Sequence, residues 1–513
     1  MNRRELALGG AFVAATALAA HFAFSWIGFN PTDDGMFLSA ARRILAGQVP
    51  HRDFIWPYPA LTSVVHIPEV AFGGDRMLWI SRLVVWLELA LLAWCWTMIF
   101  LREAPVLERV AAALTALALS IHTFQIMTWH TIDALLAASI GIWMRIAGRF
   151  PVVAYLLIGS SVLFKQSFLP AVPLLLIAFG DWRRVSRVIA AILPSILYVV
   201  FLIATGALPD AMLQLAARSN IVQTGIVAFL FTWVIPLGFL IGYAAIRFRL
   251  PLLLIAPVAA AAVLILIDVT LTGGALMSLF GVAAGVVVAL RMHQAGLLAL
   301  IVAWCTALSY GENNPAFAAG ALALFLIATF AAQQPNSRAW VLSLCVVVVG
   351  STVIARYVHP DAERRASELR YPLAGVLPGF AGIRTNANTY AYLADLSRAI
   401  DRAHGTYTIL PDNPGVWAAA RQLNPLCIDW AQLCINDRII DARPGQNPLS
   451  ARVIADIDRQ RGHLALIVQK VEAGPLFIRI QPLYMSPAWK PIVEHVRGTM
   501  TKVDETEFFE IYR

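Results

Sequence analysis

Two adjacent acids, Asp33 and Asp34, stand in the stretch "NPTDDGMFLSAARRILAG", directly after the first apolar segment of the chain. A carboxylate in this position can cap the helix that follows, bind a metal ion or accept a proton from an attacking hydroxyl. One acid is enough for a helix cap, and two adjacent acids repel each other. We therefore predict that at least one of the pair is catalytic and that the other caps the helix.

Two further groups of charged side chains could bind a polar substrate. His51, Arg52 and Asp53 follow in "HRDF", and the alternative for them is an ordinary solvated turn. Lys165 interrupts the apolar sequence "SSVLFKQSFLP". Its ammonium group could bind a phosphate, or it could reach the membrane interface by extending its apolar stem.

Other candidates stand at the ends of apolar segments. His130 and Asp133, in "TWHTIDA", can be an interfacial histidine and a capping acid, or part of a site. Arg82, Arg218 and the 310–314 turn "YGENN" are weaker candidates. Because charge inside a membrane is costly, each of these residues needs a partner or a function.

The composition is that of an integral membrane protein. The chain has 513 residues, of which 59% are hydrophobic and 14% are charged, and its mean hydropathy is +0.70. Soluble globular proteins carry about 25% charged residues. From about Arg356 onward the chain resembles ordinary soluble protein, which predicts a membrane domain over 1–355 and a soluble domain over 356–513. No Arg- or Lys-rich run with interleaved aromatics is found, so we do not expect nucleic-acid binding.

Apolar runs long enough to span a membrane, or nearly so, are thirteen in number. They are 7–28, 78–100, 109–127, 132–147, 151–164, 167–180, 188–206, 224–244, 252–268, 273–290, 295–310, 315–333 and 339–355. The first is preceded by Arg3 and Arg4 and is longer than the apolar region of a signal peptide, so we expect an uncleaved first span. The sequence thus predicts an α-helical polytopic protein.

Arginines are concentrated at alternate ends of these runs. With a cytoplasmic N-terminus, the inner loops are rich in arginine and the later outer loops are poor in it, as the positive-inside rule requires. This orientation places the 29–77 loop and the C-terminal domain on the outer side. In that loop the apolar residues of 36–45 fall on one helical face, with Arg42 and Arg43 on the other, which predicts an amphipathic helix at the membrane surface. A second such helix is predicted over 60–72.

The C-terminal part mixes two kinds of periodicity. The ranges 388–403 and 450–461 are helix-like, whereas "TYTIL", "LALIV", "LFIRI" and "FFEIY" have strand-like composition, which predicts a small α/β domain. It carries no phosphate-binding glycine motif of the dinucleotide or P-loop type, so nucleotide binding is not expected. Cys427 and Cys434 could form a local disulfide if this domain faces an oxidising compartment, and otherwise are two free thiols.

The first loop resembles that of the GT-C superfamily of membrane glycosyltransferases. It is most similar to the branch of the protein O-mannosyltransferases and the lipid A aminoarabinose transferases. The shared pattern is an acid pair, a helix ending A-x-x-[IL]-x-x-G, the motif P-x-x-D-F and a proline-rich stretch. Here these are Asp33 and Asp34, 41–47, 50–54, and Pro57 with Pro59. The second acid of the pattern is often Glu, so the Asp pair leaves the subfamily open.

The resemblance implies a transferase that takes a sugar, hexose or pentose, from a polyprenyl-phosphate donor with inversion at the anomeric carbon. The acceptor could be lipid A, a polysaccharide, a glycolipid or a protein. Asp33 or Asp34 would be the general base, and Lys165 loosely matches a lysine that follows a short apolar helix in these enzymes. A divalent metal is possible but not implied. The location would be the inner (plasma) membrane. The alternatives are a transporter or flippase of a lipid-linked saccharide, and a structural factor of the envelope.

Overall fold

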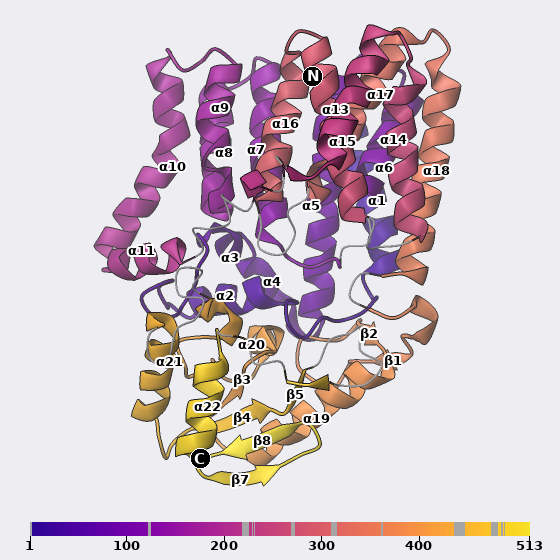
Figure 1. The fold of residues 1–513 in the computed structure, drawn as a ribbon. Helices are drawn as coiled ribbons and strands as arrows, with labels where there is room; N and C mark the ends of the chain where they lie inside the picture. The colour runs from indigo at the N-terminus through magenta and orange to yellow at the C-terminus, as the bar shows by residue number, and fades with distance from the viewer. Residues whose placement is uncertain are drawn as a thin grey trace.

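The computed structural model describes residues 3–121, 125–217, 225–227, 229, 231–267, 272–308, 315–360, 363–435, 447–472, 481–483, 486 and 488–513. A bundle of apolar helices forms one end of the molecule, and a smaller C-terminal region with strands forms the other (Figure 1). Short helices lie between these two parts. We call this middle layer, residues 29–76, the junction.

Each of the thirteen apolar runs overlaps a helix of the bundle. These helices are α1 (Arg3–Phe24), α5 (Met77–Phe100), α6 (Val106–Ile121), α7 (His130–Ile146), α8 (Pro151–Phe164), α9 (Ala171–Ala178), α10 (Val185–Ala204), α13 (Val234–Arg247), α14 (Leu252–Ile267), α15 (Thr272–Ala289), α16 (Gln294–Ala307), α17 (Ala319–Gln333) and α18 (Ser337–Val358). Among the described residues, five helical segments are long and apolar enough to cross a membrane. Several helices could therefore cross it, whereas the count of thirteen spans is not confirmed.

Small residues let two bundle helices pack backbone to backbone. Gly238 and Gly242 of α13 face Gly281 and Gly285 of α15. A Cβ atom at Gly242 would lie 2.1 Å from the carbonyl oxygen of Val282. Such glycine pairs, four residues apart, are typical of helix packing in membranes, where apolar burial gives little net drive for association.

The C-terminal region is a sheet covered by helices on both faces. The sheet has the order β3 (Tyr407–Leu410), β4 (Ala465–Gln469), β8 (Phe509–Tyr512), β7 (Lys502–Glu505), with β3 and β4 parallel and the other pairs antiparallel. Ile467 of β4 packs towards α19 (Ala387–Ala403), whereas its neighbours Leu466 and Val468 pack towards α21 (Pro448–Arg459) and α22 (Lys490–Thr499). This alternation follows from the two-residue period of a strand.

The remaining C-terminal elements are short. They are β1 (Tyr371–Pro372), β2 (Arg384–Thr385), α20 (Pro414–Ala419), β5 (Val471–Glu472) and β6 (Gln481–Pro482). Three of the four predicted strands and both predicted helices are present. The fourth predicted strand, 476–480, lies outside the described residues. Helix α22 and strand β7 were not predicted, since they are short and largely polar.

The junction is built from α2 (Met36–Leu45), α3 (Leu61–Val65) and α4 (Ile67–Phe72), beside α11 (Leu208–Ala216) (Figure 1). Helix α2 has the predicted apolar and basic faces, but its basic face meets protein. The Arg43 guanidinium donates to both carboxylate oxygens of Asp429, at 2.8 and 2.6 Å, and Arg42 donates to the carbonyl oxygen of Trp417. The two arginines therefore fasten α2 to the C-terminal region.

Breaking the Arg43–Asp429 pair should loosen the C-terminal region. The two side chains are only 2% and 7% exposed, so Arg43→Met leaves a buried, unpaired carboxylate. We expect a loss of about 3–5 kcal/mol in the free energy of unfolding of this region. The measurement is thermal unfolding or limited proteolysis of the full chain in detergent. Arg461→Met, which breaks the exposed pair with Asp458, is the matched control and should cost less than about 1 kcal/mol. Equal losses would contradict the anchoring role of Arg43.

Candidate functional site

Asp33 and Asp34 lie in the turn that leads into α2, and their surroundings differ. The Asp34 side chain is 2% exposed, and its Oδ2 accepts hydrogen bonds from Arg82 at 2.6 Å and from Gln125 at 3.3 Å. The Asp33 side chain is half-buried and accepts a hydrogen bond from the Asn30 amide at 3.2 Å. Asp34 is therefore fixed inside the protein, whereas Asp33 stays within reach of solvent.

The predicted cap of α2 is wrong, because the N-cap position is occupied by Gly35 and not by either acid. Gly35 has a φ of 83°, which favours glycine. A Cβ atom there would lie 2.6 Å from the Cα of Gly415 at the start of α20. The chain thus needs a glycine at this point so that the acid-bearing turn can pack against the C-terminal region.

Arg82 joins three parts of the chain at Asp34. It comes from α5, and its guanidinium donates to the backbone carbonyls of Ser25, Ile27 and Gly28 as well as to Asp34. Burial raises the pKa of Asp34 above its usual value, and the guanidinium charge offsets this only in part. Arg82 was predicted to bind substrate. In the structure it positions Asp34 and the end of the segment that follows α1.

A second group of charged side chains lies between α4, α5 and α7. The Glu69 carboxylate accepts a hydrogen bond from Nδ1 of His66 at 2.7 Å. The Nε2 atom of the same ring faces Asp133 Oδ1 at 3.4 Å and Glu88 Oε1 at 3.9 Å. One ligand atom each from His66, Glu88 and Asp133 lies within 4.8 Å of the others. We call these four residues the His66 cluster.

Of the four residues of this cluster, the sequence predicted only Asp133 as a candidate site residue. A signal for the others was present, because Glu88 is an acid within the apolar run 78–100, and an acid inside a membrane span indicates a functional or paired position. His66 and Glu69 were missed because both lie in a short junction segment whose neighbours are known only from the tertiary structure.

Aromatic contacts connect α2 to the helix that carries Asp133. The ring of Phe37, one helical turn beyond Asp33, lies 5.1 Å from the ring of His130, and Tyr58 lies 4.8 Å from it. His130 begins α7, and Asp133 follows three residues later, on the same side of the helix. The contact between Phe37 and His130 thus joins the helix that follows the acid pair to the helix that carries Asp133.

Lys165 is buried at the end of α8. It is 4% exposed, and its ammonium group donates to the carbonyl oxygen of Thr306 at 3.3 Å. The side chain of its neighbour Gln166 donates to the carbonyl oxygen of Pro57. Lys165 therefore lies inside the protein, at the contact of the bundle with the junction, and not at an exposed interface.

His51, Arg52 and Asp53 form a turn that binds other helices. The His51 ring contacts Tyr198 of α10 at 2.7 Å and Gln214 of α11 at 3.2 Å. Asp53 accepts from Arg52 and from the backbone of Val49, and the hydrogen bond from Arg52 lowers its pKa. None of the contacts described for this turn involves the acid pair. Its side chains fasten the junction to α10 and α11.

Three further predictions concern the two cysteines of the C-terminal region, Arg218 and the 310–314 turn. Cys427 and Cys434 are both buried free thiols, so the possible disulfide is not formed. Burial raises the pKa of Cys427 to about 11 and also raises that of Cys434. Arg218 and the 310–314 turn lie outside the described residues.

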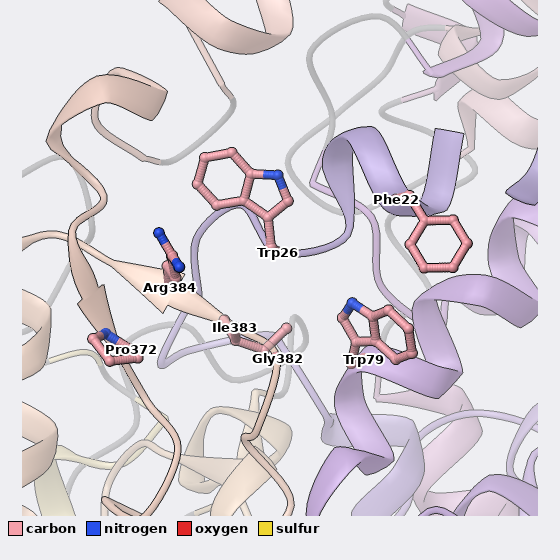
Figure 2. A pocket seen from close by; sticks show the side chains of 7 residues that line it. All are labelled: Phe22, Trp26, Trp79, Pro372, Gly382, Ile383 and Arg384. Atoms are coloured by element: carbon pink, nitrogen blue, oxygen red, sulfur yellow. The ribbon is translucent and has the colours of Figure 1, made fainter. Parts of the chain in front are cut away.

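A hollow of about 510 Å³ opens beside the junction (Figure 2). Its lining is mostly apolar and consists of Phe22, Trp26, Trp79, Pro372, Gly382, Ile383 and Arg384. The hairpin of β1 and β2 is bonded to the chain after α1, because Arg384 exchanges backbone hydrogen bonds with Trp26 and Gly28. Gly28 in turn accepts from Arg82. The hollow therefore shares one hydrogen-bonded framework with Asp34.

Burial of His51 should make the protein less stable in acid. Desolvation lowers the pKa of His51 from 6.5 to about 4, so the folded protein resists a proton that the unfolded chain accepts. The stabilisation is complete above pH 6.5 and is lost as the pH falls towards 4. At 1.36 kcal/mol per pKa unit, the loss is about 3 kcal/mol. Unfolding in detergent across pH 4–8 should show a shallower acid loss for His51→Gln. Parallel curves for the two proteins would contradict this account.

Comparisons with known proteins identify no relative of this chain. No protein-family model, no curated protein and no solved structure matches the chain. The function must therefore be inferred from the residues and their arrangement.

Proposed function

We propose that the chain is an inverting glycosyltransferase that moves a sugar from a polyprenyl-phosphate donor to an acceptor at the outer face of a membrane. The observation that supports this most strongly is the division of the acid pair. Asp33 is accessible and Asp34 is held by Arg82, at the contact between an apolar helix bundle and a folded C-terminal region. The resemblance of the first loop to GT-C enzymes supports the same reading.

Asp33 is the better general base of the two. A general base must reach the proton that it removes. Asp34 is 2% exposed and its Oδ2 atom is occupied by Arg82 and Gln125. Protonation of Asp34 would break that buried ion pair. We therefore assign the proton-accepting role to Asp33 and a positioning role to Asp34.

The reaction proposed is a single displacement. The acceptor hydroxyl attacks the anomeric carbon as its proton passes to Asp33, and the bond from that carbon to the phosphate oxygen breaks. One displacement inverts the configuration at the anomeric carbon. The polyprenyl phosphate leaves with both electrons of the broken bond, and a nearby cation would favour its departure.

The aromatic hollow supports a lipid-phosphate donor. Its tryptophan and phenylalanine side chains offer apolar surface, and the exposed Arg384 guanidinium at its edge is suited to a phosphate. Of the predicted substrate-binding residues, Arg82 contacts Asp34, and His130 contacts Phe37 of α2. We keep these two in the proposed site. His51, Arg52, Asp53 and Lys165 are assigned to the framework around it.

The proposed enzyme is a GT-C-like protein of thirteen spans in the inner (plasma) membrane. Its N-terminus is cytoplasmic and its C-terminal α/β domain is extracytoplasmic. The arginine distribution supports this orientation. The placement of the N-terminus at the bundle end away from the C-terminal region is compatible with it (Figure 1).

Asp33→Asn should abolish transfer without unfolding the protein. Loss of a general base lowers the rate by about 10²–10⁴-fold. Cells that lack the chain should accumulate a polyprenyl-phosphate sugar and lose one glycan or lipid substituent, and the Asp33→Asn chain should not restore that substituent. Mass spectrometry of membrane lipids and glycans measures both. Asp75→Asn, at an exposed acid of the same junction, is the matched control and should restore it.

Three outcomes would change the proposal. Restoration by Asp33→Asn would refute the assignment of the base. An unchanged lipid and glycan profile in cells without the chain would refute a glycosyltransferase function. Accumulation of the lipid-linked sugar on the inner leaflet alone would favour the alternative, a flippase of a lipid-linked saccharide.

A further inference from the structure

The His66 cluster gathers more negative charge than its own residues can balance. Three carboxylates surround one imidazole, and the side chains of His66, Glu69, Asp133 and Glu88 are only 1%, 5%, 2% and 15% exposed. Even a protonated imidazole would neutralise only one of the three acids. Because isolated charge is expensive in an apolar bundle, the cluster needs a further positive charge or bound protons.

The hydrogen bond to Glu69 decides which ring atom is available. A carboxylate can only accept, so the bond of 2.7 Å requires the hydrogen to be on Nδ1 of His66. The Nε2 atom is then directed at Glu88 and Asp133. A carboxylate that holds the far nitrogen of a metal-binding histidine is the usual support of such a ligand, since it fixes both the tautomer and the ring orientation.

Nε2 makes one long hydrogen bond, to Asp133 Oδ1, and its contact with Glu88 Oε1 is beyond hydrogen-bond range, so the two contacts leave room for a shared cation. Asp133 Oδ1 is 3.4 Å from Nε2, and Glu88 Oε1 is 3.9 Å from it. Hydrogen bonds from nitrogen to oxygen are about 2.7–3.2 Å long. Two ligands of a tetrahedral ion with bonds of about 2.0–2.1 Å lie about 3.3–3.4 Å apart. All three ligand atoms lie within 4.8 Å of one another, so a small movement of Glu88 would complete the set.

Two buried oxygens at the same place provide independent support. Asp133 Oδ2 and Glu88 Oε2 accept no hydrogen bond from an N–H group or a hydroxyl in the part of the chain that the structure describes, and the two carboxyl groups lie in contact with each other. The Asp133 side chain is 2% exposed, so solvent does not replace the missing partner. A buried carboxylate oxygen without a donor is uncommon in folded proteins and needs an explanation, such as an ordered water, a shared proton or a bound ion.

We propose that His66, Glu88 and Asp133 bind one divalent transition-metal ion, with Zn²⁺ as the best fit, and that Glu69 is a positioning residue for His66. One imidazole and two carboxylates are a ligand set that zinc accepts, with a fourth position left for water or a ligand oxygen. The site would join the α3–α4 segment to α5 and α7. This inference does not depend on the proposed sugar transfer.

The metal would also set the position of the acid-bearing turn. His130 lies one helical turn before Asp133 in α7, and its ring contacts Phe37 of α2. Fixing Asp133 to the ion would hold α7, and through His130 the helix that follows Asp33. The ion is thus a structural support of the junction that also offers one open coordination position.

The test uses the purified full-length chain in detergent. The protein is stripped with a chelator and titrated with Zn²⁺, Mn²⁺ and Mg²⁺, and bound metal is measured by mass spectrometry and by competition with a zinc indicator. We expect about one Zn²⁺ per chain, with zinc bound more tightly than magnesium. X-ray absorption should show one imidazole nitrogen together with oxygen ligands and no sulfur. A wild-type chain that retains no zinc, or a spectrum with sulfur or several imidazoles, would overturn the assignment.

Four variants locate the ion. Asp133→Asn and His66→Gln should each abolish stoichiometric binding. Glu69→Gln should weaken it by about 10–100-fold, as expected for a residue that supports a ligand. His463→Gln, at an exposed histidine of the C-terminal region, should bind as the wild type does.

Folding of the variants is checked by size-exclusion chromatography and tryptophan fluorescence. If His66→Gln does not fold, the near-isosteric Asp133→Asn decides the question. Zinc binding that is unchanged in Asp133→Asn would overturn the proposal, because the cluster would then be balanced by protons instead of a metal ion. None of these measurements depends on enzymatic activity, so their failure leaves the proposed function to be judged separately.

Discussion

The buried ion pair between Arg82 and Asp34 is the interaction on which the junction depends. Neither side chain could be buried alone, because an isolated charge in this environment would cost several kcal/mol. The guanidinium is further satisfied by carbonyl groups of residues 25–28, which have no partners inside a helix. One side chain of α5 therefore determines where the chain leaves α1 and how Asp33 is presented to solvent.

Buried arginine contacts also hold the C-terminal region against the junction. Helix α2 carries its apolar residues towards the aromatic side chains of the junction, while Arg42 and Arg43 bind the C-terminal region. The region also contributes the hairpin that binds the segment after α1, and Gly415 next to Gly35. The C-terminal region thus forms one wall of the candidate site. A change in how the C-terminal region packs against the junction would therefore also move the acid pair.

The charged residues that the structure brings together differ from those that the sequence predicted to form one site. Asp33 and Asp34 were singled out because their types and spacing are unusual after an apolar run. The cation at Asp34 proved to be Arg82, while the basic residues of the "HRDF" turn bind the backbone and other helices. The His66 cluster joins a junction segment to two bundle helices, so its members lie far apart in the chain and show no common motif.

By itself the sequence determined the helical bundle, the composition boundary near residue 356, the amphipathic pattern of α2 and most of the C-terminal strands. These follow from local composition and periodicity, since an apolar run must be buried in lipid or protein wherever it lies. Only the tertiary structure decided which acid is locked and which is accessible, what covers Arg42 and Arg43, and that His66, Glu88 and Asp133 meet. Those facts depend on contacts between residues that are distant in sequence, and a charge reveals its partner only when the fold has brought the two together.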